Sequence, residues 1–340
     1  MKLLNNIIRK SEFFFHSMVD DDADASLLSR DESNAVKGLL ILLVILGHNK
    51  YLMQGGYSYR FLYSFHVYSF FLLPFLYNWK DSLLKDTLWR NLKRFYVPYT
   101  ITFIALYVIS VMQSNDLSIS KLLLAWVCGS QHLLSEAFGS GSFLWFIPTM
   151  FSLLAIRWFY YKGSKRMRSL LLCCSLISLI GFAYVLYPFT LLWLYSPFCI
   201  YLALAMLLPA VVCRRLFRSM NPQIVGLAFF MLMVAVMVVY PLKGYFYTYL
   251  TINRLICPTL ILLFILSLRG CLRDSALLKN IGKYSFQLYL IHLFVYNGSY
   301  YIIDKYLETN ICIGFILYIA VLFVSYSLAR IPFLKVMFPR

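Results

Sequence analysis

The fold class of this chain is decided by residues 35–53, which read AVKGLLILLVILGHNKYLM. Between Lys37 and His48 the stretch holds ten consecutive residues without a charge. As a helix, 19 residues extend over about 28 Å, close to the thickness of the hydrocarbon core of a bilayer. The stretch therefore predicts a transmembrane helix.

Stretches of similar length and composition recur along the chain. Its 340 residues are 61% hydrophobic and only 13% charged, with a mean hydropathy of +0.73. This composition excludes an ordinary soluble domain and an intrinsically disordered chain. We predict an all-α polytopic membrane protein, a bundle of about ten transmembrane helices. The predicted spans lie near residues 35–53, 59–78, 95–113, 143–161, 168–187, 190–213, 222–241, 252–269, 284–303 and 311–330.

The basic residues indicate how the predicted spans are oriented. The chain carries 31 Lys and Arg against 14 Asp and Glu, a formal net charge of +17. With both termini cytoplasmic, 25 basic residues fall in inner segments and 6 in outer ones, as the positive-inside rule requires. The cations form short clusters between apolar runs, so we expect no nucleic acid as partner. The weaker apolar segment 117–138 then predicts an interfacial helix on the outer side.

Three segments follow from this topology. Residues 1–33 form a predicted cytoplasmic acidic tail, which holds 7 of the 14 acidic residues and lacks the apolar core of a signal peptide. Residues 34–331 form the predicted ten-span domain, and residues 332–340 form a short cytoplasmic tail. We expect no appended soluble domain, so the chemistry has to come from the spans and their short loops.

Ionisable side chains inside a bilayer are costly and usually functional. No Asp or Glu lies well inside a predicted span, which argues against a carboxylate proton relay and against catalysis by paired carboxylates. The 8 Cys form no CxxC pair and no cluster with zinc-ligand spacing, so we expect no metal site. Histidine is left as the only side chain in the spans that can act as a base near neutral pH.

Three histidines lie within the predicted spans. His48 is about five residues from the outer end of the first span, and His66 is about seven residues into the second, which starts on the same side. The two are therefore expected at similar depth. His292 lies near the middle of the ninth span. Two interpretations stay open for each residue: a hydrogen-bonded contact between helices, or a direct part in catalysis.

A cluster of cations, Arg90, Lys93 and Arg94, opens the third span on the inner side. On an α-helix these positions share one face, and three cations on one face suit the phosphates of a ligand. Lys37 lies eleven residues, or about three turns, before His48. For all four cations the alternative is a purely topogenic role as positive-inside residues.

Five motifs occur in order between residues 37 and 292. They are Lys37 followed after ten residues by His48, YSFHVYSFF at 63–71, the three cations with Pro98-Tyr99, LWFIP at 144–148, and IGKYSFQLYLIH at 281–292. In this order the chain resembles the integral-membrane acyltransferase-3 family. There are two departures. The family's basic pair, commonly Arg-x-x-Arg, reads Arg90-x-x-Lys93 or Arg90-x-x-x-Arg94, and LLPF at 72–75 replaces its frequent Ser-Gly.

The resemblance implies a multi-pass enzyme of the bacterial inner membrane. Such an enzyme transfers an acyl group, usually acetyl, from cytoplasmic acyl-CoA to a hydroxyl of a cell-envelope polysaccharide or glycolipid sugar. Acetyl-CoA would be a donor substrate, and no cofactor is expected to stay bound. The expected partners are the lipid bilayer, the glycan or lipid-linked sugar acceptor, and glycan-assembly proteins.

The resemblance also implies roles for single residues. His48 is the expected catalytic residue, either as general base or as transient acyl carrier. The phosphates of acyl-CoA are expected on Arg90, Lys93 and Arg94. Support of catalysis or binding of the acceptor is expected from His66, Lys37, Trp145, Tyr289 and His292.

Two other function classes are compatible with such a composition. A transporter or flippase of a lipid-linked glycan would show inverted repeats or broken helices, and neither is visible in the sequence. A non-catalytic membrane partner in a glycan-assembly complex would tolerate replacement of its histidines.

Overall fold

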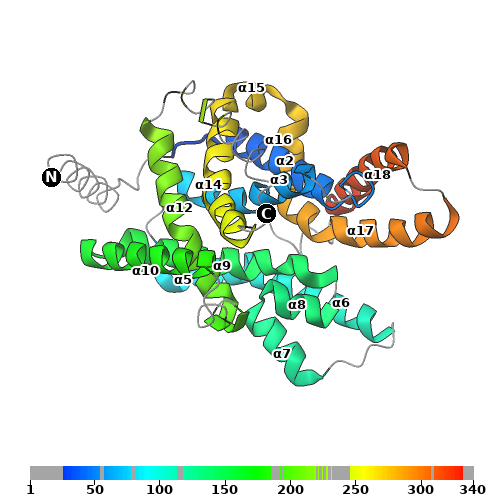
Figure 1. Cartoon of the computed structure of the whole chain (residues 1–340), viewed down its shortest axis with the longest axis horizontal. Helices are drawn as coiled ribbons and strands as arrows, with labels where there is room; N and C mark the ends of the chain where they lie inside the picture. Colours follow the sequence, from blue (N-terminus) through cyan, green and yellow to red (C-terminus); the bar gives the residue numbers. More distant parts are fainter. Residues whose placement is uncertain are drawn as a thin grey trace.

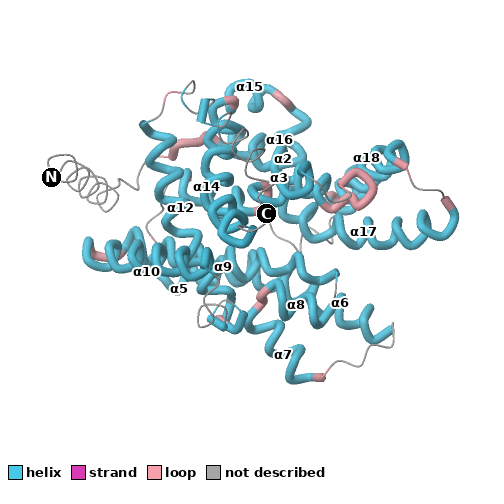
Figure 2. The backbone as a smooth tube through the Cα atoms, in the orientation of Figure 1, coloured by secondary structure: helices cyan, strands magenta, loops and turns pink. Residues whose placement is uncertain are grey.

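The computed structural model describes residues 26–53, 57–77, 82–112, 118–138, 140–184, 191–192, 194–219, 246–307 and 310–331, with a few single positions between 221 and 231. In this part of the chain the structure is helical and contains no strand (Figure 2). The predicted all-α class is thus confirmed for the described residues. Most of the predicted acidic tail, up to residue 25, and the predicted tail 332–340 lie outside them.

The helices are given in chain order. They are α2 (Arg30–Gly47), α3 (Tyr57–Phe65), α4 (Tyr68–Leu72), α5 (Leu84–Asn91), α6 (Val97–Met112), α7 (Ile119–Cys128), α8 (Gln131–Phe138), α9 (Phe146–Lys162), α10 (Lys165–Tyr184), α12 (Ile200–Ser219), α14 (Phe246–Ser267), α15 (Arg269–Asp274), α16 (Ala276–Lys283), α17 (Ser285–Tyr306) and α18 (Ile311–Ala329). Short 3₁₀ helices lie at Leu73–Leu76, Ser140–Trp145 and Pro197–Cys199, and a π-helical turn lies at Leu92–Tyr96.

Helices overlap nine of the ten predicted spans, and the tenth, 222–241, lies outside the described residues except for single positions. By length and composition, four helical stretches in the described part can cross a membrane: Leu84–Met112, Phe143–Lys162, Pro197–Ser219 and Ile311–Ala329. The count of ten crossings and the cytoplasmic placement of the termini stay predictions. The predicted interfacial segment 117–138 forms two short helices, α7 and α8, separated by a left-handed Gly129.

Helix α2 lies at the centre of the upper group of helices in Figure 1, in contact with α3, α4, α15, α16, α17 and α18. Ser29 and Glu32 form a reciprocal capping box that fixes its first turn. The side chains of Leu40, Ile41 and Ile45 are fully buried. The first predicted span is therefore surrounded by protein on most of its length.

Two glycines bring the backbones of α2 and α16 into contact. A Cβ at Gly38 would lie 2.1 Å from the carbonyl oxygen of Leu278, and a Cβ at Gly282 would lie 1.7 Å from that of Asn34. Only glycine leaves room for so close an approach. His48 follows Gly38 by ten residues on α2, and His292 follows Gly282 by ten residues across the break at Tyr284, so this contact brings the start of α17 next to α2.

The second predicted span is not a continuous helix. The helix is interrupted at His66–Val67, between α3 and α4, and continues as a 3₁₀ helix at Leu73–Leu76. Pro74 lacks the amide hydrogen that an α-helix needs at this position, which explains the change to 3₁₀ geometry. This break is not visible in the sequence, because the mean hydropathy of the segment stays high across it.

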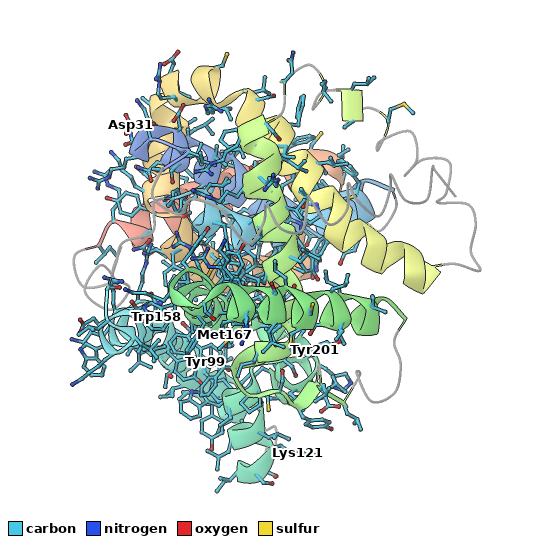
Figure 3. The ribbon with its side chains drawn as sticks, turned by 90° about the vertical axis from the view of Figure 1, so that its left-hand side faces the viewer. Asp31, Tyr99, Lys121, Trp158, Met167 and Tyr201 are labelled. Atoms are coloured by element: carbon cyan, nitrogen blue, oxygen red, sulfur yellow. The ribbon has the colours of Figure 1, made fainter. Side chains whose placement is uncertain are left out.

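The third predicted span starts with a π-helical turn, Leu92–Tyr96, between α5 and α6. A π turn rotates less per residue than an α-helix, so residues three apart no longer point the same way. This turn therefore moves Lys93 off the face of Arg90, whereas Arg94, four residues after Arg90, stays on that face. The indole nitrogen of Trp158 on α9, a residue labelled in Figure 3, donates to the carbonyl oxygen of Ser82 at 2.9 Å and so ties α9 to the segment before α5.

Candidate active site

A cavity of about 330 Å³ lies between α2, α4, α5, α9 and α17. Among the described residues that line it are four cations, Lys37, Arg90, Arg94 and Arg157, and no carboxylate. Each cation comes from a different element, α2, α5, the π turn and α9. Four positive charges around one cavity favour an anionic ligand, above all one with phosphates.

The cations gather at one end of the cavity. The guanidinium of Arg157 donates to the carbonyl oxygen of Tyr77 at 3.0 Å, and the hydroxyl of Tyr77 lies 2.6 Å from that of Ser33, one turn before Lys37 on α2. Tyr77 thus links the end of α2 that carries Lys37 to the end of α9 that carries Arg157. We name this end the mouth, defined by Lys37, Arg90, Arg94 and Arg157.

The opposite end of the cavity is apolar. Along α2 the lining residues Lys37, Ile41 and Val44 follow a spacing of four and three, so they share one helix face. The next position on that face is His48, about 16 Å from Lys37 along the helix axis. His48 itself does not line the cavity, and neither do His66 and His292, so along α2 the lining ends at Val44, one turn before His48.

His48 is surrounded by aromatic side chains. Its Nδ1 lies 3.1 Å from the hydroxyl of Tyr63, and its ring centroid is 5.2 Å from that of His292. The ring of Tyr63 in turn lies 4.7 Å from the ring of His66. The structure thus brings together all three histidines that the sequence placed in the spans, with Tyr63 between two of them.

His66 and His292 carry the same hydrogen-bond pattern. Nδ1 of His66 bonds to the carbonyl oxygen of Leu62, and Nδ1 of His292 to that of Leu288 at 2.9 Å. A carbonyl can only accept, so each Nδ1 carries the hydrogen and each Nε2 presents a lone pair. Both Nε2 atoms are buried, and neither has a hydrogen-bond partner in the described part of the chain. Among the described residues, no group of three His, Cys, Asp or Glu is arranged to hold a metal ion.

The backbone at His48 is held by tyrosines of α17. Helix α2 ends at Gly47, so His48 is its C-cap and not a residue five positions inside a longer helix. The hydroxyl of Tyr296 donates to the carbonyl oxygen of Ile45 at 3.0 Å, and that of Tyr300 to the carbonyl oxygen of His48 at 2.8 Å. These bonds satisfy carbonyls that a helix end leaves without partners.

An ionic cluster follows directly after His48. Lys50 forms an ion pair with Asp304, and the hydroxyl of Tyr51 donates to the same carboxylate at 2.5 Å. The hydrogen bonds from Lys50 and Tyr51 hold the pKa of Asp304 below its usual value. The ammonium of Lys50 also lies 4.4 Å from the ring centroid of Tyr300. The cluster joins the end of α2 to the end of α17.

The remaining predicted site residues fall into two groups. Tyr289 lines the cavity, and its hydroxyl donates to the carbonyl oxygen of Phe143. Trp145 does not line it and packs against Phe71, with ring centroids 5.8 Å apart. Lys93 does not line it either. Because of the π turn its ammonium lies over the ring of Trp89, 4.7 Å from the centroid, so the predicted shared face holds for Arg90 and Arg94 alone.

Sequence reasoning missed two residues of this site. Arg157 was assigned a topogenic role, because it lies near the inner end of the fourth predicted span like other positive-inside residues. Tyr63 belongs to one of the quoted motifs, but a single tyrosine among 27 carries no signal of its own. Its place opposite His48 depends on how α3 packs against α2, which the local pattern does not encode.

The apolar helices indicate a membrane protein, and the cation-lined cavity is its candidate site. The model of the acyltransferase-3 family, described as an acyltransferase domain, matches residues 30–330. The chain therefore belongs to this family and is an acyltransferase, as the sequence motifs predict. Comparisons with curated proteins and with solved structures gave no match.

Proposed function

We propose that this acyltransferase transfers an acyl group, acetyl in particular, from cytoplasmic acyl-CoA to a hydroxyl of a cell-envelope polysaccharide or glycolipid sugar. It acts as a multi-pass protein of the bacterial inner membrane, with both termini cytoplasmic. One observation carries the proposal: a single face of α2 joins Lys37 at the mouth to His48, and the cavity follows that face.

The mouth supports acyl-CoA as the donor. The phosphates of CoA carry several negative charges, and Arg90, Arg94 and Arg157 offer planar groups that pair with phosphate oxygens. The pantetheine arm then extends past Ile41 and Val44 toward His48. The mouth is on the side that the positive-inside rule makes cytoplasmic, where acyl-CoA is found.

His48 supports two routes for the transfer. As a general base it takes the proton of the acceptor hydroxyl while that oxygen attacks the thioester carbon; the carbon–sulfur bond breaks, and the thiolate of CoA takes up the proton. As a nucleophile it first accepts the acyl group from sulfur and then passes it to the acceptor oxygen. Both routes use the lone pair on Nε2 of His48, and therefore require the tautomer in which Nδ1 donates to the hydroxyl oxygen of Tyr63, 3.1 Å away.

The other two histidines support binding of a hydroxyl-rich acceptor. The Nε2 atoms of His66 and His292 have no partner and can each accept a hydrogen bond from a sugar hydroxyl. A buried acceptor atom without a partner is costly, so occupation by a hydroxyl lowers the free energy of the complex. The glycan would reach this end of the site from the lipid or from the outer side, alone or presented by glycan-assembly proteins.

A flippase for a lipid-linked glycan is the second candidate, because the break at His66–Val67 is a feature of transporter helices. Membership in an acyltransferase family and the cation-lined cavity favour the transferase. The two functions differ in chemistry: a flippase moves the glycan without changing it.

The experiment is acetyl transfer in membranes that contain the protein. We expect label from acetyl-CoA to enter polysaccharide or glycolipid, and His48→Ala to abolish it with unchanged protein in the membrane. His132→Ala is the matched control, because His132 is an exposed residue of α8 paired with Glu136. Full transfer by His48→Ala would contradict the assigned role, and absence of transfer by the unaltered protein would contradict the proposed function.

A further inference from the structure

The described residues that line the cavity include six uncharged polar side chains, and four of these are already hydrogen-bonded within the protein. The four are Tyr77, Ser82, Thr87 and Tyr289. The side chains of the other two, Asn91 and Ser285, form no hydrogen bond within the described part of the chain. The cavity wall thus keeps two uncharged polar groups available for a ligand.

Asn91 is the more deeply buried of the two. It is the last residue of α5, directly after Arg90 and directly before the π turn. Only 7% of its surface is exposed, although its side-chain amide has two hydrogens to donate and an oxygen that accepts. A buried amide without a partner raises the free energy of the protein, and a ligand that pairs with the amide removes this cost.

Ser285 lies on the neighbouring wall of the cavity, at the start of α17. The ring of Phe286 is 5.4 Å from the ring of Phe95, which follows Asn91 by four residues. This contact brings the start of α17 next to the segment that carries Asn91. His292 follows Ser285 by seven residues, about 10 Å along the helix axis. Ser285 therefore lies on the mouth side of the histidine cluster.

The depth of Asn91 indicates which part of acyl-CoA it meets. The side chains of Arg90 and Arg94 are exposed, whereas Asn91 is buried, so Asn91 lies deeper than the cations beside it. When the phosphates are at the mouth, the pantetheine arm is the part of CoA that continues inward, and adenosine stays outside. The arm carries two amides between the phosphates and the sulfur. An amide offers one hydrogen and one carbonyl oxygen, and the side chain of Asn91 can pair with both.

We propose that Asn91 and Ser285 bind the amides of the pantetheine arm and so make the enzyme selective for thioesters carried on that arm. Asn91 donates to the carbonyl oxygen of one amide and accepts from its hydrogen. The hydroxyl of Ser285 bonds to the other amide. The inference rests on the proposed function, since it describes how the donor of that reaction is recognised.

The experiment uses the two halves of CoA as competitive inhibitors of acetyl transfer from acetyl-CoA in membranes that contain the protein. Pantetheine carries the amides and no phosphate, whereas adenosine bisphosphate carries the base and phosphates and no amide. We expect Asn91→Leu to raise the inhibition constant of pantetheine by roughly tenfold, the effect of losing one or two neutral hydrogen bonds. The inhibition constant of adenosine bisphosphate should stay the same.

A second variant and a control accompany Asn91→Leu. Ser285→Ala should raise the inhibition constant of pantetheine by roughly threefold to tenfold. Ser285 is only partly buried, so its replacement tests the proposal even if Asn91→Leu does not fold. Asn280→Leu should change neither constant, because Asn280 is an exposed residue of α16 that does not line the cavity.

The outcomes separate the inference from the proposed function. A larger effect of Asn91→Leu on adenosine bisphosphate than on pantetheine would assign Asn91 to the adenine base, whose edge an asparagine can also pair with, and would overturn the inference. An equal rise of both constants, an unchanged constant for pantetheine in both variants, or no inhibition of the unaltered protein by pantetheine would overturn it as well, while acyl transfer stands. Absence of transfer from acetyl-CoA would overturn the proposed function and the inference with it.

Discussion

The mouth and the histidine cluster lie on the same face of α2, but they are held in place differently. The cations of the mouth come from four elements, and Arg157 is held by its hydrogen bond to the carbonyl oxygen of Tyr77. The approach of His48 and His292 depends on packing, through the close contact of Gly38 and Gly282 between α2 and α16 and through the hydrogen bonds from two tyrosines of α17 to the end of α2. The comparison teaches that the mouth is assembled from separate elements, whereas the histidine cluster depends on how α2 packs against α16 and α17.

The largest effect is expected at the contact between Gly38 and Gly282, because it positions α2, which carries residues of both regions. Gly282→Ala places a Cβ 1.7 Å from the carbonyl oxygen of Asn34, so the two helices must separate. Overpacking of this kind costs about 1–3 kcal/mol or more, and backbone cannot yield as a side chain does. We expect a clear fall in the melting temperature of the detergent-solubilised protein, with loss of acyl transfer.

Gly298→Ala on α17 serves as its control, because a Cβ there has nothing within 4 Å. Equal melting temperatures of the Gly282 and Gly298 variants would show that the close contact does not hold the histidine cluster.

An effect of intermediate size is expected at the mouth. Arg94→Ala removes one of four cations, and hydrogen bonds to charged groups contribute about 1.5–3 kcal/mol each. The KM for acyl-CoA should rise by roughly tenfold or more, with the KM for the acceptor unchanged. Lys93→Ala should change neither, since Lys93 lies over Trp89 outside the cavity. If Lys93→Ala raised the KM for acyl-CoA as much as Arg94→Ala, the π turn would not separate their roles.

The smallest effect is expected at the histidine end. Tyr300→Phe removes a hydroxyl that donates to the carbonyl oxygen of His48 and accepts from the amide of Lys50. A neutral hydrogen bond contributes about 1 kcal/mol, so we expect kcat to fall by roughly fivefold with the KM for acyl-CoA unchanged. Tyr301→Phe, at an exposed neighbouring position, should leave kcat as it was. Equal kcat values for Tyr300→Phe and Tyr301→Phe would contradict a positioning role of Tyr300.

Much of the fold could be predicted from hydropathy alone. Periodic apolar stretches of about 20 residues indicate helices wherever they occur, so the helix positions agree with the described structure. The break at His66–Val67 and the π turn at Leu92–Tyr96 could not be predicted this way. At both places the backbone hydrogen bonds go to a partner one or two residues away from the usual one, and the mean hydropathy of the segment stays the same.

The sequence predicted which types of residue form the site, but it predicted less of how these residues are arranged in space. His48, His66, Arg90 and Arg94 stand out because polar side chains are rare in apolar stretches. The approach of His292 to His48 depends on two helices 240 residues apart in sequence, and Arg157 resembles any cation at the end of a span. Both depend on tertiary packing, which local patterns do not encode.

The paired glycines have a consequence for how this chain can change. Ten residues separate Gly38 from His48, and ten separate Gly282 from His292. From Gly38 to Gly47 the chain is one continuous α-helix, so insertion or deletion of one residue there would turn the position of His48 by about 100° around α2 and shift it by about 1.5 Å. From Gly282 to His292 the chain passes the break between α16 and α17 at Tyr284, so a change of length there would alter how two helices meet. The first interval thus fixes a distance along one helix, and the second fixes the junction of two.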